Sequence, residues 1–466
     1  MLLALPVAVE AQFTYTTNNG TITIAGYNGP GGAVAIPNTV YGLPVVSVGT
    51  AAFYYNHAVT SIVIPNGVTN IGTYAFNWCN ILTNVSFPNS LISIEDYAFQ
   101  DSGLTTLAFP SSLRSIGAQT FSGCTALRSL TISNGLTSIP AMTFHYCSSL
   151  TSVTFPGSLT SIGSDAFIYC SSLTYVSIPA SVTSIGSFAF ANCTSLTNVS
   201  LTANLASIGS SAFQNTRLTS VTIPSTVTSI GSQAFSNCDG ITNITVDPLN
   251  PSYSSSNGIL FNKSQTLLML YPPAKSGSAY NIPASARNVD GYAFYHTMLA
   301  NVTFLNAVTN IGAYAFNGCT NLVNVTIPKS LVSFGESAFA GCTKLVGLYF
   351  GGNAPMLLGK VSSSDPTIIY YLPGATGWNT NYGGRPTVLW NPTPQKNSPN
   401  FGVRTNRFGF DITGTANIPL VVEACTNFGN PIWLSLQSCT LTNGTIYFSD
   451  PQWMNYPSRF YRLRSP

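Results

Sequence analysis

Charged residues are scarce in this chain. Asp, Glu, Lys and Arg make up 6% of its 466 residues, against roughly 25% in an ordinary globular protein. The formal net charge of +3 is scattered, whereas polyanion binding needs clustered Lys and Arg, so we expect no nucleic-acid partner. We interpret the one small basic cluster, Arg459, Arg462 and Arg464, as a solvated C-terminal tail. With 45% hydrophobic residues, the composition predicts a folded, β-rich protein rather than a disordered one.

Long apolar runs are also missing. No segment offers 18 consecutive apolar residues, so we expect no membrane-spanning helix beyond a signal peptide. A short apolar run ends in Val9-Glu10-Ala11, and a small residue before Gln12 suits a signal-peptide cleavage site. Because a positively charged start is missing, we interpret residues 1–11 as a signal peptide whose true start lies upstream. The alternative is an ordered N-terminal strand.

What the chain does contain is a repeat of 22 or 23 residues. One unit begins at Leu150 and the next, 23 residues later, at Leu173, with the same order of apolar residues, Pro, Gly, Phe and Cys. A phenylalanine marks the equivalent position in twelve units: Phe53, Phe76, Phe99, Phe121, Phe144, Phe167, Phe190, Phe213, Phe235, Phe294, Phe316 and Phe339. The longer step from Phe235 to Phe294 predicts an enlarged repeat at about 247–281, either a structural insertion or a protruding binding loop.

Each part of the unit has a predicted conformation. The Leu-x-x-Val-x-Ile run alternates as a strand with its apolar residues inward, and Val-Thr-Ser-Ile places two more inside. Gly follows in most units, where we expect a sharp turn with positive φ, although Glu95, Pro140 and Asp290 stand there in three units. Ala-Phe then opens a short helical turn. Since one unit cannot bury these faces alone, we predict a solenoid of stacked units.

The repeat resembles the BspA-like, or treponemal-type, leucine-rich repeats of bacterial and protist surface proteins. The resemblance rests on the Ile-Pro-x-x-Val-Thr-x-Ile-Gly-x-x-Ala-Phe run and the Cys-x-x-Leu-Thr-x-Val return, and it covers about Ile36 to Phe350. It implies a right-handed leucine-rich-repeat solenoid. It also implies a bacterial protein that is secreted or on the cell surface, commonly an adhesion or binding protein. The family has no shared active site.

The chain outside the repeats divides into smaller segments. We assign residues 12–35 to an N-terminal cap, 36–350 to the repeats, 351–390 to a C-terminal cap and 391–400 to a Pro-rich linker. Residues 401–466 alternate apolar and polar residues in short runs, which predicts a small antiparallel β-sandwich.

The ten cysteines fall into two groups. Cys425 and Cys439 lie in the small C-terminal domain and are a candidate disulfide, because two cysteines in an exported domain often pair. The other eight occupy one repeat position and lack the Cys-x-x-Cys spacing of a metal site. We predict that these eight are buried thiols that form no disulfide: Cys79, Cys124, Cys147, Cys170, Cys193, Cys238, Cys319 and Cys342.

The sequence contains no recognisable catalytic pattern. A glycosidase needs two facing carboxylates roughly 5–10 Å apart, yet Glu95–Asp96 is the sole adjacent acidic pair. His57, His145 and His296 lie in separate units, too far apart to share a metal or a catalytic triad. The sequence therefore predicts a protein that is not an enzyme and has no cofactor or metal site.

The outward strand positions of the repeat carry mostly Ser, Thr and Asn. Such an array of hydroxyl and amide groups suits a glycan, and a protein ligand is also possible. The alternative is that Ser and Thr merely favour strands and keep the face soluble, as in a purely structural extracellular or envelope protein without a ligand. The candidate ligand-binding residues are Ser152, Thr154, Tyr175, Ser177, Asn198, Ser200, Ser220 and Asn243.

Overall fold

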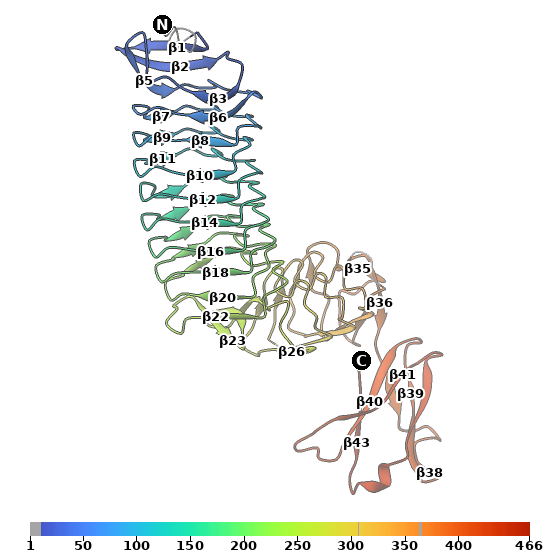
Figure 1. Cartoon of the computed structure of the whole chain (residues 1–466). Helices are drawn as coiled ribbons and strands as arrows, with labels where there is room; N and C mark the ends of the chain where they lie inside the picture. Colours follow the sequence, from blue (N-terminus) through green and yellow to red (C-terminus); the bar gives the residue numbers. More distant parts are fainter. Residues whose placement is uncertain (1–10, 306, 363–365) are drawn as a thin grey trace. The chain divides into compact units, whose positions relative to one another are not determined.

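The computed structural model describes residues 11–305, 307–362 and 366–466, so the expected signal peptide lies outside the described residues except for Ala11. The chain divides into two units, residues up to 265 with 269–275, and residues 266–268 with 276–466. Figure 1 shows that both consist almost entirely of strands and turns. Within the described ranges, the one helical segment is η1 (Trp453–Asn455), a short 3-10 helix.

In the first unit, the strand that begins each repeat lies parallel to the equivalent strands of its neighbours. Tyr175 is paired with Asn198 and Val176 with Val199, so the register equals the sequence repeat. Equivalent side chains therefore align in columns along the unit, as the repeat predicted. We call these strands the long-strand face: β3 (Gly32–Ala35), β6 (Val59–Val63), β8 (Asn84–Ser86), β10 (Thr106–Ala108), β12 (Ser129–Thr131), β14 (Ser152–Thr154), β16 (Tyr175–Ser177), β18 (Asn198–Ser200), β20 (Ser220–Ile223) and β22 (Asn243–Val246).

A second column of parallel strands comes from the Val-Thr-Ser-Ile run. It begins with β2 (Thr21–Tyr27), which pairs in parallel with β5 (Leu43–Val48). Antiparallel β1 (Phe13–Asn18) closes its end, and β4 (Thr39–Val40) pairs with β5. We call this column the short-strand face, and its remaining members in this unit are β7 (Asn70–Ile71), β9 (Ser93–Ile94), β11 (Ser115–Ile116), β13 (Ser138–Ile139), β15 (Ser161–Ile162), β17 (Ser184–Ile185), β19 (Ser207–Ile208) and β21 (Ser229–Ile230).

The third side of each repeat, which we call the turn face, differs from the expected short helical turn. Asp165 and Tyr169 have φ values of 57° and 62°, in the left-handed region. Their N–H groups and that of Phe167 donate to carbonyls of the next repeat, while Ile168 and Cys170 donate three residues back. The alternation of the two bond types turns every second amide toward the neighbouring repeat. A ladder between repeats therefore replaces the helix, whose amides would all bond internally.

The expectation of positive φ at the repeated glycine is also wrong. None of the glycines after Ile has a left-handed φ; the left-handed residue comes two positions later, as at Phe188 after Gly186. Glycine is used here because the backbones of neighbouring repeats approach closely. A Cβ atom on Gly186 would lie 2.4 Å from the Ser164 nitrogen and 2.6 Å from the Gly163 carbonyl carbon.

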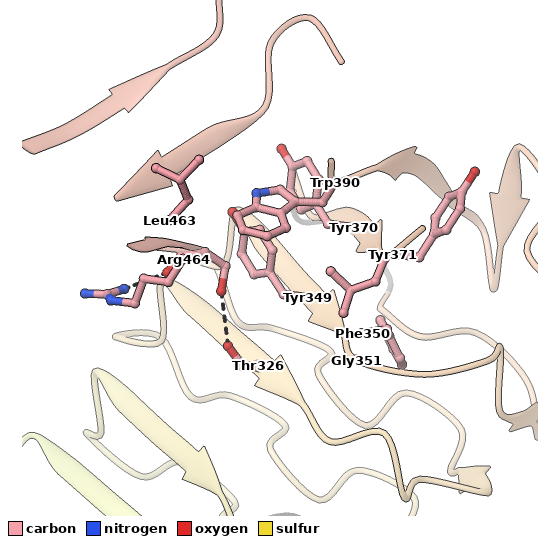
Figure 2. A pocket seen from close by; sticks show the side chains of 11 residues that line it. Thr326, Tyr349, Phe350, Gly351, Tyr370, Tyr371, Trp390, Leu463 and Arg464 are labelled. Atoms are coloured by element: carbon pink, nitrogen blue, oxygen red, sulfur yellow. Dashed lines mark hydrogen bonds between the residues drawn. The ribbon is translucent and has the colours of Figure 1, made fainter. Parts of the chain in front are cut away.

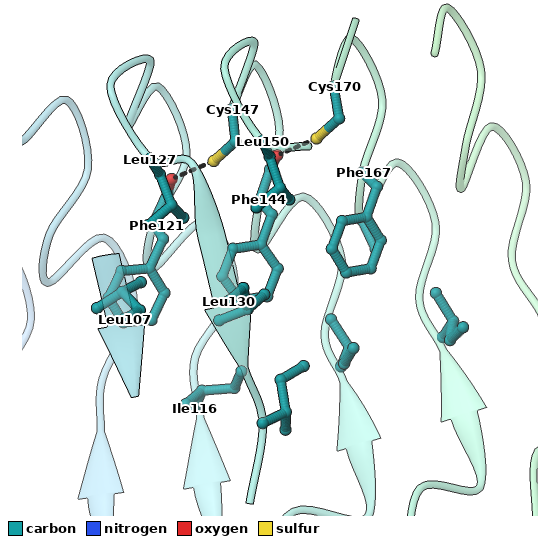
Figure 3. Close-up of a cluster of buried hydrophobic side chains, with 14 of the residues drawn as sticks. Leu107, Ile116, Phe121, Leu127, Leu130, Phe144, Cys147, Leu150, Phe167 and Cys170 are labelled. Atoms are coloured by element: carbon teal, nitrogen blue, oxygen red, sulfur yellow. Dashed lines mark hydrogen bonds between the residues drawn. The ribbon is translucent and has the colours of Figure 1, made fainter. Parts of the chain in front are cut away.

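The core of the first unit is built from the columns of apolar side chains. Phe167 lies between Phe144 and Phe190, with ring centroids 5.2 Å and 5.3 Å apart and interplanar angles of 14° and 2°. Figure 3 shows Phe121, Phe144 and Phe167 of this column, with Cys147 and Cys170 beside them. The Cys170 thiol donates to the Phe144 carbonyl of the preceding repeat at 3.3 Å. The repeats that carry this cysteine are thus joined to the preceding repeat by ring contacts and by a buried thiol hydrogen bond.

The enlarged repeat contains strands rather than an irregular loop. In the first unit, β23 (Tyr253–Ser256) pairs antiparallel with β24 (Ile259–Asn262). The side-chain amide of the fully buried Asn250 donates to the carbonyls of Pro224 and Val227 at 2.7 Å and 2.9 Å. These bonds fix the insertion to the preceding repeat. The arrangement favours the structural interpretation of the insertion over a protruding loop.

The second unit repeats both strand columns. The short-strand column runs from β25 (Leu267–Leu270), of which Leu267 and Leu268 belong to this unit, through β27 (Asn288–Val289), β29 (Asn310–Ile311) and β31 (Ser333–Phe334) to β33 (Met356–Leu357). The long-strand column comprises β26 (Ala279–Ile282), β28 (Asn301–Phe304), β30 (Asn324–Ile327), β32 (Gly347–Phe350), β34 (Ile368–Tyr371) and β36 (Arg385–Leu389), with β35 (Asn381–Tyr382) antiparallel to β36. The segment expected as a cap, 351–390, thus continues the parallel pairing beyond the recognisable repeats.

The C-terminal residues form two antiparallel sheets, which agrees with the expected sandwich. One sheet contains β37 (Thr393–Gln395), β38 (Gly402–Arg404), β39 (Arg407–Thr413) and β42 (Thr445–Asp450). The other has the order β41 (Leu434–Thr440), β40 (Pro419–Cys425), β43 (Phe460–Arg464). Because β37 pairs with β39, part of the expected linker at 391–400 belongs to the domain itself.

The three C-terminal arginines do not form a solvated tail, contrary to the expectation. The side chain of Arg459 is 7% exposed and its Nε lies 2.8 Å from Asp450. Arg462 and Arg464 both form ion pairs with the buried Glu423. Burial alone would raise the pKa of Glu423, but hydrogen bonds from Arg464 and Arg462 bring the pKa below its ordinary value. Arg462 and Arg464 therefore fasten the last strand to β40 of its own sheet, and Arg459 joins the residue before that strand to β42 of the other sheet.

The structure confirms that the cysteine column is buried and that its thiols form no disulfide. The candidate disulfide between Cys425 and Cys439 is contradicted. Neither sulfur is bonded to another, and Cys439 is paired with Leu420. Leu420 lies five residues, about 17 Å along an extended strand, from Cys425. A disulfide requires Cα atoms within about 7 Å, so the strand register keeps these thiols apart.

We expect the column thiols to be nearly inert toward a thiol reagent in the folded protein. Burial raises the pKa of Cys79 and of Cys124 to about 12, and the thiolate is the reactive form. Titration with Ellman's reagent should leave the eight column thiols unmodified, whereas all ten should react in guanidinium chloride. Recovery of only eight thiols in denaturant would show that Cys425 and Cys439 are oxidised to a disulfide after all.

Candidate ligand-binding surfaces

The eight candidate residues of the long-strand face lie where the sequence predicted. All of them are exposed, on β14, β16, β18, β20 and β22. Tyr175 is paired with Asn198, and Ser177 with Ser200, so their side chains emerge on the same side of adjacent strands. Ser220 is paired with Asn243 in the same way. The strands thus present hydroxyl and amide groups in two columns.

A second surface, on the turn face, was missed by the sequence analysis. Tyr54, Tyr55, Tyr74 and Trp78 are 50%, 50%, 38% and 42% exposed, and the half-buried Tyr97 adjoins them. Tyr55 stacks on Trp78 with ring centroids 5.5 Å apart, and Tyr74 on Tyr97 at 4.9 Å. Tyr54 joins the two stacks by edge contacts with Tyr55 and Tyr74. We call these five residues the aromatic patch.

The sequence did contain a signal for the aromatic patch. Tyr55 and Trp78 each lie two residues after the core phenylalanine of their unit, and Tyr74 and Tyr97 lie two residues before it. All four have left-handed φ values between 57° and 59°. In that conformation the side chain leaves the core side of the turn. Tyr146 and Tyr169 repeat the arrangement farther along the unit, with ring centroids 4.4 Å apart.

The histidines and acidic residues are used in local contacts. His57 contacts the Asn80 side chain at 2.8 Å, and His145 contacts Ser122 at 3.4 Å. Glu95 accepts hydrogen bonds from the backbone and hydroxyl of Thr73 at 3.0 Å and 2.8 Å. No group of three His, Cys, Asp or Glu side chains capable of holding a metal occurs in residues 11–305, 307–362 and 366–466. The described part of the chain likewise holds no helix able to cross a membrane.

A cavity of about 250 Å³ lies in the second unit beside the last repeats. Figure 2 shows Tyr349, Tyr370 and Trp390 grouped beside Leu463 of β43. Tyr349 stacks on Tyr370 with centroids 4.7 Å apart, and the Trp390 indole donates to the Pro419 carbonyl at 2.8 Å. Tyr349 and Tyr370 share one apolar cluster with the C-terminal β domain. We interpret this aromatic group as the closure of the repeat core.

Comparison with known proteins places the repeats in a described family. The model of the BspA type leucine rich repeat region matches residues 46–174, 160–271 and 274–357. A leucine-rich repeat protein from Bacteroides ovatus is 26% identical, with 82% of this chain and 98% of that chain covered and a TM-score of 0.58. No curated protein matches the chain.

Two other solved structures share the repeat at lower structural agreement. A leucine rich cell surface protein from Faecalibacterium prausnitzii is 28% identical over 78% of this chain and 88% of that chain, with a TM-score of 0.49. The T. pallidum leucine rich repeat protein is also 28% identical, over 50% of this chain and 88% of that one, with a TM-score of 0.35. Since the family model alone matches more than half of the residues, the chain belongs to the BspA-type leucine-rich repeat family.

Proposed function

We propose that this chain is a secreted or cell-surface interaction protein, without enzymatic activity, whose aromatic patch binds an extracellular protein. The observation that carries the proposal is the gathering of five aromatic side chains, four of them more than a third exposed, on three consecutive repeats. Tyr and Trp are enriched among the residues that dominate protein–protein binding energy. Exposed clusters of such side chains mark interaction sites on soluble proteins.

The geometry of the aromatic patch favours a protein over a sugar. Tyr55 and Trp78 are inclined by 19°, and Tyr74 and Tyr97 by 14°, so within each pair the rings cover one another's faces. Exposed Tyr and Trp rings offer both apolar contact and, through their O–H and N–H groups, hydrogen bonds. A pyranose ring stacks instead on an open aromatic face. The location outside the cell is supported by the family and by the expected signal peptide.

The long-strand face supports a second candidate, binding of a glycan. Its eight Ser, Thr, Asn and Tyr side chains point outward in register along five strands. Hydroxyl and amide groups at a regular spacing suit repeated hydrogen bonds with a polyhydroxylated chain. In this case the strand residues Tyr175 and Asn198, rather than the aromatic patch, would carry the binding.

The two candidates and a purely architectural role are separated by one panel of variants. The full chain is tested against purified extracellular-matrix proteins and a glycan array. We expect Tyr55→Ala with Trp78→Ala to weaken binding to a matrix protein about 30-fold or more, the loss typical of hot-spot residues. The matched control, Tyr146→Ala with Tyr169→Ala, removes another stacked pair on the same face and should retain affinity.

Other outcomes would overturn the proposal. Binding to glycans alone, lost in Tyr175→Ala or Asn198→Ala, would assign the function to the long-strand face. The absence of any binding partner in both screens would leave the architectural role. All the substituted side chains are at least partly exposed, so we expect each variant to fold. Circular dichroism of each variant checks that the fold is retained.

A further inference from the structure

The C-terminal β domain contains a cavity of about 550 Å³ that is distinct from the surfaces described above. It is bordered by residues of β39, by β43 with the residue before it, by the segment that follows β36 and by Phe428 of the loop between β40 and β41. A volume of this size is typical of sites for small organic ligands. The residues that line it differ in kind from the rest of the chain, since they are mostly aromatic or cationic.

One part of the cavity is apolar and open to a ligand. Phe401, Phe428 and Phe460 line it and are 42%, 67% and 40% exposed, although such rings are ordinarily buried. Phe428 contacts Phe460 with ring centroids 5.2 Å apart. Phe401 packs edge-on against Phe408, a further lining residue, at 5.6 Å. Four phenylalanines thus form a wall suited to an aromatic or branched aliphatic body.

The other part of the cavity presents a buried cation. Arg459 lines it with a side chain that is 93% buried, and its Nε pairs with Asp450 at 2.8 Å. Its guanidinium also lies over the Tyr456 ring, 4.2 Å from the centroid. The Nη1 atom is buried and has no hydrogen-bond partner among the described residues. A buried N–H group without an acceptor is unfavourable, so Nη1 is an unused donor on a residue that lines the cavity.

The charge of the lining points to the sign of the ligand. Lys396, Arg459 and Arg462 are among the lining residues, which include no acidic side chain. Asp450 pairs with Arg459, whereas Glu423 is shared by Arg462 and Arg464, so these ion pairs leave one positive charge unneutralised and Lys396 adds another. This excess of positive charge favours a negatively charged ligand, and a carboxylate matches the planar donors of a guanidinium.

We propose that this cavity binds a small organic acid that has one carboxylate and an aromatic or branched aliphatic body. The carboxylate lies near Lys396, and the Arg459 side chain turns slightly toward the cavity so that its buried Nη1 donates to the carboxylate. The body packs among Phe401, Phe408, Phe428 and Phe460. This site is independent of the proposed function of the repeats, because none of its residues belongs to the aromatic patch or to the long-strand face.

The test compares two ligands of the same shape by isothermal titration calorimetry on the full chain. We expect 3-phenylpropionate to bind at least tenfold more tightly than 3-phenylpropan-1-ol, which keeps the ring and lacks the charge. Equal affinities for the acid and the alcohol would show that the cations of the cavity do not contribute to binding. If neither compound binds, the proposal is wrong.

Variants then assign the contacts. Arg459→Lys retains a cation beside Asp450 but removes Nη1, and it should lower the preference for the acid at least tenfold. Lys396→Gln should weaken the acid several-fold and leave the alcohol unchanged, whereas the exposed Lys329→Gln in the repeats should change neither. Phe428→Ala should weaken both ligands. An unchanged preference for the acid in Arg459→Lys and Lys396→Gln would overturn the assignment.

Discussion

Replacing Phe167 with alanine is expected to destabilise the repeats by about 3–5 kcal/mol, the usual range for a buried phenylalanine. The ring is fully buried and stacks on both neighbouring rings. Its removal opens a cavity that the repeats cannot close, because their spacing is fixed by two ladders of strands and one of turns. Guanidinium chloride denaturation followed by circular dichroism measures the loss as a lower midpoint.

The control for this substitution is a phenylalanine on the surface of the next repeat. Phe188 is 39% exposed and lies on the turn face, so Phe188→Ala should change stability by less than about 1 kcal/mol. Equal effects of Phe167→Ala and Phe188→Ala would contradict the assignment of the stacked column as the core. Because repeats can unfold in parts, both variants are compared by midpoint and slope.

Gly186→Ala is expected to have the second largest effect, a loss of about 1–3 kcal/mol through overpacking. The added methyl group would lie 2.4 Å from the Ser164 nitrogen. Because this nitrogen is a backbone atom, the contact cannot be relieved by a change of side-chain rotamer. Relief requires lengthening of the hydrogen bond from Gly186 to the Ile162 carbonyl, now 2.8 Å. Glu95, Pro140 and Asp290 occupy the same position in other repeats, so local adjustment limits the loss.

The matched control is Gly157→Ala. No heavy atom lies within 4 Å of a Cβ at Gly157, and its φ is outside the left-handed region. The methyl group should leave stability unchanged or raise it by about 0.4–1 kcal/mol, because alanine restricts the unfolded chain. A destabilisation by Gly157→Ala equal to that by Gly186→Ala would show that the close approach between backbones is not the reason for the glycine column.

The repeats could be predicted because their signals are local and recur. Alternation around Val153 and Val176 sets which side chains are buried, and the same alternation at a spacing of 23 residues sets the register between strands. The cysteine column followed from the same periodicity. The alternation within one unit is weak evidence for a strand, but its recurrence in twelve units predicts the solenoid fold.

The turn face could not be predicted in this way because its conformation depends on contacts between repeats. The left-handed φ at Asp165 and Tyr169 is stabilised by hydrogen bonds to residues 22 positions away. The glycine at position 186 is visible in the sequence. The backbone of the preceding repeat, whose close approach requires a residue without a Cβ atom, is not. For the same reason the outward direction of Tyr55 and Trp78 was not foreseen, although their positions in the unit were visible.

In the C-terminal domain, residue types alone did not predict which side chains contact one another. Arg459 and its neighbours have the composition of a tail, yet Asp450 and Glu423, which hold them, lie 9 and 39 residues away in sequence from Arg459 and Arg462. The spacing of Cys425 and Cys439 likewise permits a disulfide until the strand pairing is known. Without a repeat, nothing in the sequence shows which distant residues meet.

The identity of the contacts between successive repeats bears on how such a chain can change over generations. A segment of one full period, such as the 23 residues from Phe144 to Ala166, joins its neighbours through the same ring stacks and thiol bonds at both ends. Unequal recombination that adds or removes one whole period therefore restores every contact at the junction. Each event would lengthen or shorten the molecule by about 4.8 Å, the distance between paired strands. Evolution can thus change the length of the stack of repeats without altering the packing of its core.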